Sequence, residues 1–204
     1  MADRLYVNVQ RADIQGGADA LCPIVQEMDK RLQELAQETE NIKGIMLKFQ
    51  TSNSSDQYDR ACNVISAFSN FLFDKSEELN DMQVQIVEYQ NSTNRYNEKS
   101  GCFSNPNPHD VRKVIVDVDV QHFQFTLDEM RYVNQSIETY IKNAEDISNQ
   151  LLNNKNEVGS IWRDPQYEDF SQFIDEVVTA TKQSLTIVND YSIHLNQQIA
   201  EYNN

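Results

Sequence analysis

The feature that most constrains the fold of this 204-residue chain is an internal repeat of its apolar positions at an offset of 109 residues. Without a gap, the apolar positions of residues 21–86 largely fall on those of residues 130–195. The clearest identity is Gln57-Tyr58, which aligns with Gln166-Tyr167. Any two amphipathic helices align somewhere because their periods agree, but here one offset serves two helices and the turn between them. The repeat therefore favours a duplicated unit over a chance match.

Within each repeat, apolar residues recur three, four or seven positions apart, which is the period of an amphipathic helix. We predict helices at roughly 18–50, 56–97, 123–157 and 165–202. Each would be about 50–60 Å long at about 1.5 Å per residue, and a single hairpin could not bury its apolar stripe alone. We therefore expect an all-α fold in which two tandem long helical hairpins pack as an antiparallel four-helix bundle. The phenylalanines of these segments are expected mostly in the core: Phe68, Phe71, Phe73, Phe123, Phe125, Phe170 and Phe173.

The breaks between helices are marked by capping residues, glycine and proline. Asp164-Pro165 offers an N-cap followed by proline at the first helical position, and Ser54 and Ser55 stand at the equivalent place in the first repeat. The stretch KSGCFSNPNPHD contains one glycine and two prolines and is typical of a linker. We therefore divide the chain into a first hairpin (1–98), a linker (99–112) and a second hairpin (113–204).

Two short segments alternate with a period of two rather than with the helical period. Val114-Ile115-Val116-Asp117-Val118-Asp119-Val120 does so clearly, and Leu5-Tyr6-Val7-Asn8-Val9 more weakly. Both lie just before the first helix of their repeat. The pattern predicts two extended segments, near 5–9 and 114–120, that pair as a small β-ribbon.

Charge and composition bear on partners and location. The net charge of −15 repels phosphate backbones and anionic lipid surfaces, so we expect no nucleic-acid binding. The acidity is either a solvated helix surface or a docking face for a partner. The chain has no apolar run long enough for a membrane span, and charges interrupt the N-terminal apolar residues. We expect no membrane insertion and a cytoplasmic protein, or one exported by a signal-peptide-independent route.

No pattern of reactive residues indicates an enzyme. The chain has no GxSxG motif, no catalytic Cys–His signature and no glycine-rich phosphate loop. Di-iron bundles need glutamate three residues before histidine, and none of His109, His122 and His194 meets this requirement. The three cysteines are widely spaced and odd in number, so we expect them to be reduced. We predict no catalytic residues, no cofactor and no metal.

The turn between the third and fourth predicted helices holds the only tryptophan, Trp162, with Tyr167 and Phe170 one and two turns further on. A tryptophan at a helix–helix bend offers a large contact area with few rotatable bonds. It can pack against a neighbouring hairpin or plug the end of its own bundle. We select Trp162, Asp164, Tyr167 and Phe170 as the candidate protein-interaction and turn motif.

This helix, tryptophan turn and helix resemble the WXG family of helical hairpins associated with bacterial type VII secretion and toxin-delivery loci. The likeness covers residues 121–204 well and 18–98 weakly, and Trp162-Arg163-Asp164 is a Trp-x-Asp variant of the family's Trp-x-Gly turn. Family members usually dimerise into four-helix bundles, so a tandem chain resembles such a dimer fused into one polypeptide. Secreted members tend to carry Tyr-x-x-x-Asp/Glu after the last helix. No tyrosine in this chain fits that pattern.

The resemblance implies a non-enzymatic protein-interaction module, acting as an adaptor, accessory protein or substrate in a type VII-like secretion or toxin-delivery system. The partner would be a secretion component, a toxin or a related helical hairpin, and the protein a monomer or homodimer. The alternative is a structural, coiled-coil-like spacer or assembly subunit. The interrupted heptads of the first two predicted helices support it only in part.

Overall fold

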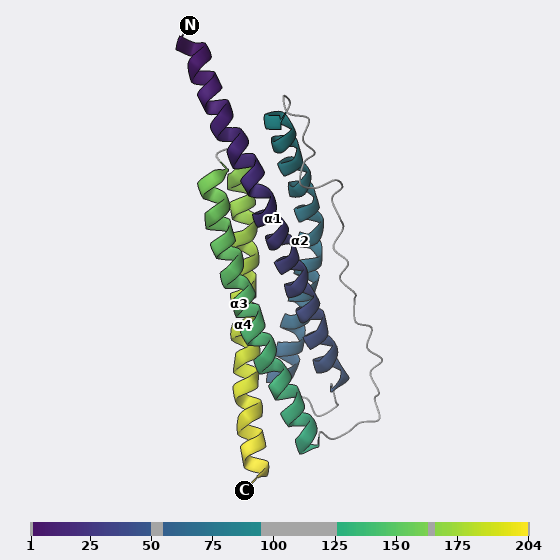
Figure 1. Cartoon of the computed structure of the whole chain (residues 1–204). Coiled ribbons are helices and arrows are strands. Elements are labelled where there is room, and N and C mark those ends of the chain that lie inside the picture. Colours follow the sequence, from purple (N-terminus) through teal and green to yellow (C-terminus); the bar gives the residue numbers. More distant parts are fainter. Residues whose placement is uncertain (1, 50–54, 95–125, 163–165, 204) are drawn as a thin grey trace.

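The structure, a computed structural model, describes residues 2–49, 55–94, 126–162 and 166–203. It contains four helices, α1 (Ala2–Lys48), α2 (Asp56–Asn94), α3 (Leu127–Ile161) and α4 (Gln166–Tyr202). Helices α1 and α4 run one way along one long bundle and α2 and α3 run the other way, so the two helices of each hairpin are antiparallel (Figure 1). The predicted all-α, antiparallel four-helix architecture is therefore confirmed.

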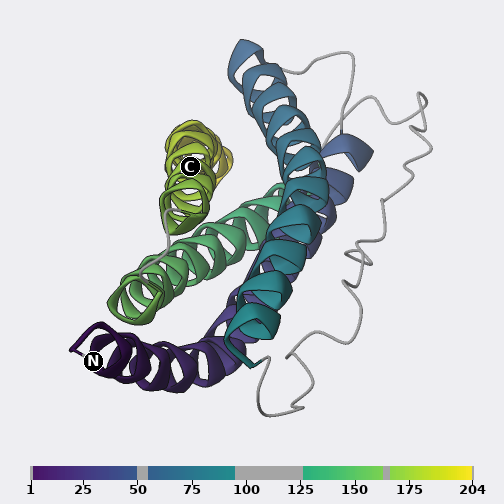
Figure 2. The same ribbon diagram turned by 90° about the horizontal axis from the view of Figure 1, so that it is seen from above.

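Each helix packs against two of the other three. Close backbone contacts join α1 to α2, α3 to α4, α1 to α3 and α2 to α4. Viewed from above, the α1–α2 hairpin lies against the α3–α4 hairpin (Figure 2). The two hairpins therefore cover each other's apolar stripes, as the lean composition of the chain requires.

The core runs through the bundle and draws on all four helices, for example Leu35 in α1, Ile65 in α2, Ile137 in α3 and Val177 in α4, none of which is exposed. Of the phenylalanines expected in the core, Phe68, Phe170 and Phe173 are buried. Phe71 is half-buried and packs against the core cluster, and Phe73 is half-buried as well. Phe123 and Phe125 lie outside the described residues.

The β-ribbon prediction is wrong for residues 5–9, which belong to helix α1. Leu5 and Val9 are four residues apart, a spacing that suits a helix as well as a strand, and such a short apolar run cannot separate the two periods. The other predicted segment, 114–120, and the linker at 99–112 lie outside the described residues, so the division of the chain into repeats stays a prediction.

Local signals explain where the helices begin. Ser55 caps α2, because its side-chain oxygen accepts a hydrogen bond from the backbone N–H of Tyr58 at 3.2 Å. Helix α3 begins with a capping box: the Thr126 hydroxyl accepts from the N–H of Glu129 at 3.2 Å, and the Glu129 carboxylate accepts from the N–H of Thr126 at 2.8 Å. Because this box fixes the start, α3 begins at Leu127 rather than near 123.

Helix α1 is much longer than its counterpart α3, with 47 residues against 35. Its extra turns lie at the N-terminal end, where α1 projects beyond the ends of α3 and α4 (Figure 1). The end of α3 and the start of α4 lie at this same end of the bundle. The tryptophan turn therefore lies beside a projecting helix.

Candidate functional site

The turn between α3 and α4 is closed by an aromatic cluster of Trp162, Tyr167 and Phe170. The Trp162 ring centre lies 5.6 Å from that of Phe170 and 6.2 Å from that of Tyr167. The rings of Tyr167 and Phe170 are 6.5 Å apart. The structure thus brings together three of the four residues selected from the sequence. The fourth, Asp164, lies outside the described residues.

The three aromatic side chains differ in what they present to a partner. Trp162 and Phe170 are each only 1% exposed, whereas Tyr167 is half-buried. The backbone N–H of Trp162 closes the end of α3 with a hydrogen bond to the carbonyl of Val158 at 2.8 Å. Trp162 and Phe170 therefore plug the end of their own bundle, and Tyr167 is the member of the cluster that reaches the surface.

Gly159, which the sequence reading overlooked, makes room for this cluster. A Cβ atom at Gly159 would lie 2.3 Å from the Tyr167 hydroxyl oxygen and 2.6 Å from its Cζ atom. The tyrosine ring therefore lies directly over the backbone of α3, where its hydroxyl donates a hydrogen bond to the carbonyl of Lys155 at 3.2 Å. A glycine two residues before the end of the helix was the available sequence signal.

The same tyrosine contact occurs in the first hairpin. The hydroxyl of Tyr58 donates to the carbonyl of Met46, which is 12 residues earlier, as Lys155 is 12 residues before Tyr167. Both the donors and the acceptors are related by the offset of 109 that relates the apolar positions. The identical Gln-Tyr pairs thus mark an equivalent contact, and both hairpins share one register. The burial differs, because Tyr58 is 2% exposed and Tyr167 is half-buried.

An open groove lies on the flank of α4 next to this cluster. Tyr167, Phe71 from α2 and Ala180 provide its apolar surface. Its other described lining residues are polar or acidic: Glu168, Ser171, Gln172, Asp175, Glu176, Thr179 and Gln183. The groove combines apolar side chains with carboxylates along one helix, which suits contact with another protein better than enclosure of a small molecule.

Two lysines next to this groove form ion pairs with two of its acidic lining residues. The ammonium of Lys75 lies 2.6 Å from Glu176 and 2.5 Å from Glu78, above the ring of Phe173 at 5.4 Å. Partial burial lowers the pKa of Lys75, but the hydrogen bonds to Glu176 and Glu78 outweigh it and raise that pKa overall. The bond from Lys75 in turn lowers the pKa of Glu176. Lys155 pairs with Asp175 at 2.5 Å.

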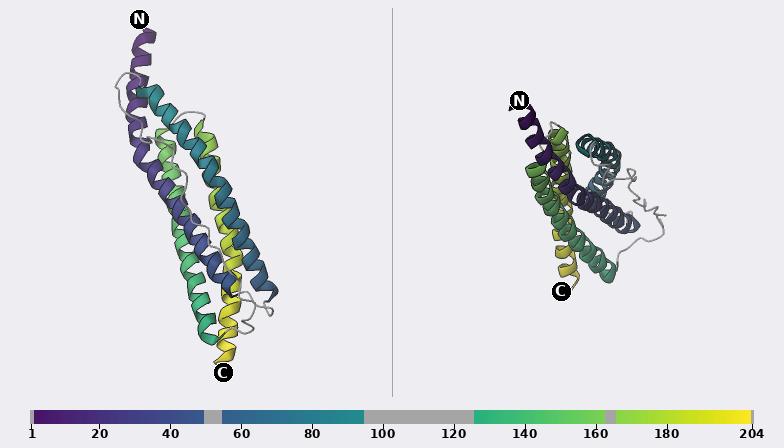
Figure 3. Two further views of the ribbon diagram at one scale, coloured as in Figure 1. Left: turned by 90° about the vertical axis from the view of Figure 1, so that its right-hand side faces the viewer. Right: turned by 45° about the horizontal axis from the view of Figure 1, so that its top comes forward.

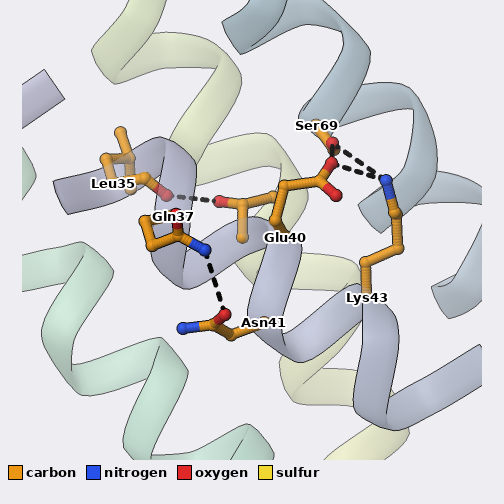
Figure 4. Close-up of polar contacts among 7 residues, drawn as sticks. Leu35, Gln37, Glu40, Asn41, Lys43 and Ser69 are labelled. Carbon is orange, nitrogen blue, oxygen red and sulfur yellow. Dashed lines mark hydrogen bonds and ion pairs between the residues drawn. The ribbon is translucent and has the colours of Figure 1, made fainter. Parts of the chain in front are cut away.

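A second polar group lies inside the bundle, between α1 and α2. Glu40 is only 1% exposed and bonds with Lys43 at 2.5 Å and with the hydroxyl of Ser69 (Figure 4). Nearby, Thr39 and the hydroxyl of Tyr140 lie 3.2 Å apart and join the two hairpins. None of these polar side chains except Tyr140 lines a described groove. They satisfy one another, so they fix how the helices pair rather than form a reaction centre.

Within the described ranges, no group of three or more His, Cys, Asp or Glu side chains is placed to hold a metal ion. No helix among them combines the length and apolar character needed to cross a lipid bilayer.

Comparisons of the chain with protein-family models, with curated proteins and with solved structures found no match. The resemblance to WXG hairpins therefore stays a prediction from the sequence.

Proposed function

We propose that this chain is a non-enzymatic protein-interaction module similar to WXG-family proteins, acting as an adaptor, accessory protein or substrate in a type VII-like secretion or toxin-delivery system. The observation that carries the proposal is the repeated Tyr–carbonyl contact of Tyr58 and Tyr167, which gives two hairpins of equal register within one chain. A pair of such hairpins is what two separate WXG-like subunits would supply. Fusing them removes the need for a second subunit to complete the bundle.

The tryptophan turn supports the same proposal. Trp162 and Phe170 are buried at one end of the bundle and hold Tyr167 at the edge of an apolar and acidic groove. A rigid aromatic end with one tyrosine at the surface suits recognition of another helical protein. The partner would be a secretion component, a toxin or a related hairpin.

Co-purification from the native host tests this proposal. The tagged full-length protein is expected to retain a component encoded beside it, such as a membrane ATPase or a large toxin. The purified protein alone is expected to behave as a monomer or homodimer whose mass does not increase further with concentration. If it retains no such component, and if deleting its gene leaves export of the neighbouring toxin unchanged, the proposal is wrong.

A structural spacer is the second candidate, and the projecting N-terminal part of α1 favours it. A 47-residue helix spans about 70 Å at about 1.5 Å per residue, and its first turns extend past α3 and α4. Such an extension could join successive molecules end to end. Light scattering separates the two candidates, because a spacer would assemble without a fixed size as its concentration rises.

A further inference from the structure

Helices α2 and α4 pack side by side, and the start of each is equivalent to the start of the other in the repeat. The two starts differ in how far the facing helix covers them. At the start of α2, Tyr191 of α4 packs edge-on against Tyr58, with ring centres 5.3 Å apart. Tyr58, Tyr191 and the neighbouring Cys62 are all almost fully buried, at 2%, 4% and 4% exposed. At this end a tyrosine from the facing helix therefore covers the first turns of α2.

At the start of α4, the equivalent positions are open. Tyr167 and Ser171 stand 109 residues after Tyr58 and Cys62, yet both are half-buried and line the groove. Figure 3 (left) shows the reason: α2 runs beside α4 in one half of the bundle and then leans away from the start of α4 towards α1. The first turns of α4 thus keep a strip, formed by Tyr167 and Ser171, of the kind that Tyr191 covers at the other end.

The charges around the groove determine what kind of partner can bind there. Lys75 and Lys155 balance Glu176 and Asp175, but Glu168 is exposed on the rim beside Tyr167, and Glu78 shares Lys75 with Glu176. The local balance is negative, and the chain as a whole carries −15. A second copy of this acidic chain would meet electrostatic repulsion, whereas a basic helix would be attracted.

We propose that this groove binds an amphipathic, basic helix of a partner protein. The partner's tyrosine would lie against Tyr167 and Ser171 as Tyr191 lies against Tyr58 and Cys62, and its lysines or arginines would face Glu168 and Glu176. The proposal rests on the proposed function and adds to it where the partner binds and what chemistry it presents. The packing of Tyr191 against Tyr58 serves as the model for this contact, because it shows that a tyrosine fits against such a strip.

A synthetic peptide tests the site on the full-length protein. The probe has the sequence of residues 184–202, which contains Tyr191, with lysine in place of Asp190 and Glu201 to make it basic. A matched peptide carries alanine in place of Tyr191. Binding is measured by calorimetry, and by the fluorescence of Trp162, the only tryptophan, whose ring lies 6.2 Å from that of Tyr167. We expect saturable binding, about tenfold weaker without the tyrosine, since an aromatic contact of about 1.4 kcal/mol corresponds to tenfold.

Two pairs of variants separate the groove from the rest of the surface. Ser171→Arg places bulk and positive charge in the groove and is expected to weaken binding at least about tenfold, whereas Thr186→Arg, on an exposed part of α4 outside this groove, is the matched control. Glu168→Lys is expected to weaken binding and to reduce its salt dependence. Asp169→Lys, in the same turn but outside the described lining, should do neither.

Four results would overturn the proposal, and the last of them leaves the proposed interaction function intact. The first is no saturable binding of the basic peptide, which would leave α2 itself as the helix that fills the strip. The second is binding that Ser171→Arg does not weaken. The third is a concentration-dependent dimer that Ser171→Arg abolishes, which would make a second copy the occupant. A Ser171→Arg protein that still retains its native partner would refute this site while leaving the proposed interaction function intact.

Discussion

Replacing Gly159 with alanine should destabilise the protein, although alanine in place of glycine normally stabilises a helix. The expected gain from a lower unfolded-state entropy is about 1 kcal/mol. Against it, the new Cβ would lie 2.3 Å from the Tyr167 hydroxyl oxygen, so the ring must move. The tyrosine would lose its 3.2 Å bond to the Lys155 carbonyl, worth about 1 kcal/mol, and its contacts with Trp162 and Phe170, each worth about 0.5–1.5 kcal/mol. We expect a net loss of about 1–3 kcal/mol.

A double-mutant cycle makes the reasoning testable. In a Tyr167→Ala background the ring is absent, so Gly159→Ala should instead stabilise the protein by about 1 kcal/mol. Urea unfolding followed by far-UV circular dichroism and by Trp162 fluorescence gives the four free energies of unfolding. The sign of the Gly159→Ala effect must change between the two backgrounds. If Gly159→Ala stabilises both proteins, Tyr167 does not lie over the helix backbone and the described cluster is wrong.

Three further predictions concern the interior. Lys43→Met should lower the free energy of unfolding by about 3 kcal/mol, because it removes the lysine that is paired with the buried Glu40 carboxylate. Adding Glu40→Leu should recover most of this loss, and urea unfolding measures both effects. Tyr58→Phe should cost about 1 kcal/mol in the same assay, since it removes one buried hydrogen bond; an unchanged midpoint would contradict that contact. Burial raises the pKa of Tyr58, Tyr140 and Tyr191 above 10.0. Unfolded tyrosines ionise near pH 10 and these do so only at higher pH, so the contribution of these tyrosines to stability should be constant below about pH 10 and fall as pH rises beyond it. Melting temperature and absorbance at 295 nm, recorded from pH 8 to 12, would contradict this if all tyrosines ionised before unfolding.

The fold was accessible from the sequence because it depends on the period of the apolar residues. Positions such as Ile65 and Ile174 lie on stripes that only a helix can bury, and both are fully buried. The extent of α1 was not predicted, because Leu5 to Val9 is too short a run to distinguish helix from strand. The position of the third helix start was missed although its signal, Thr126 followed by Glu129, is a standard capping box.

The candidate site was only partly accessible, for a different reason. Composition and spacing mark Trp162 as unusual, but whether a side chain is buried depends on what the rest of the chain places over it. The sequence left open whether Trp162 plugs its own bundle, and its 1% exposure shows that it does. The groove beside Tyr167 arises from the direction in which α2 leans, which no local pattern encodes. The buried Glu40 was likewise invisible, because its partners Lys43 and Ser69 come from two helices.

The equivalence of the two hairpins is the claim on which the account depends, and a crystal structure of the full chain tests it most directly. Residues 20–75 should superpose on residues 129–184 at the offset of 109, with each tyrosine hydroxyl, of Tyr58 and of Tyr167, bonded to the carbonyl 12 residues before it. A best superposition at a different offset, or a Tyr167 hydroxyl turned away from α3 into solvent, would contradict the account.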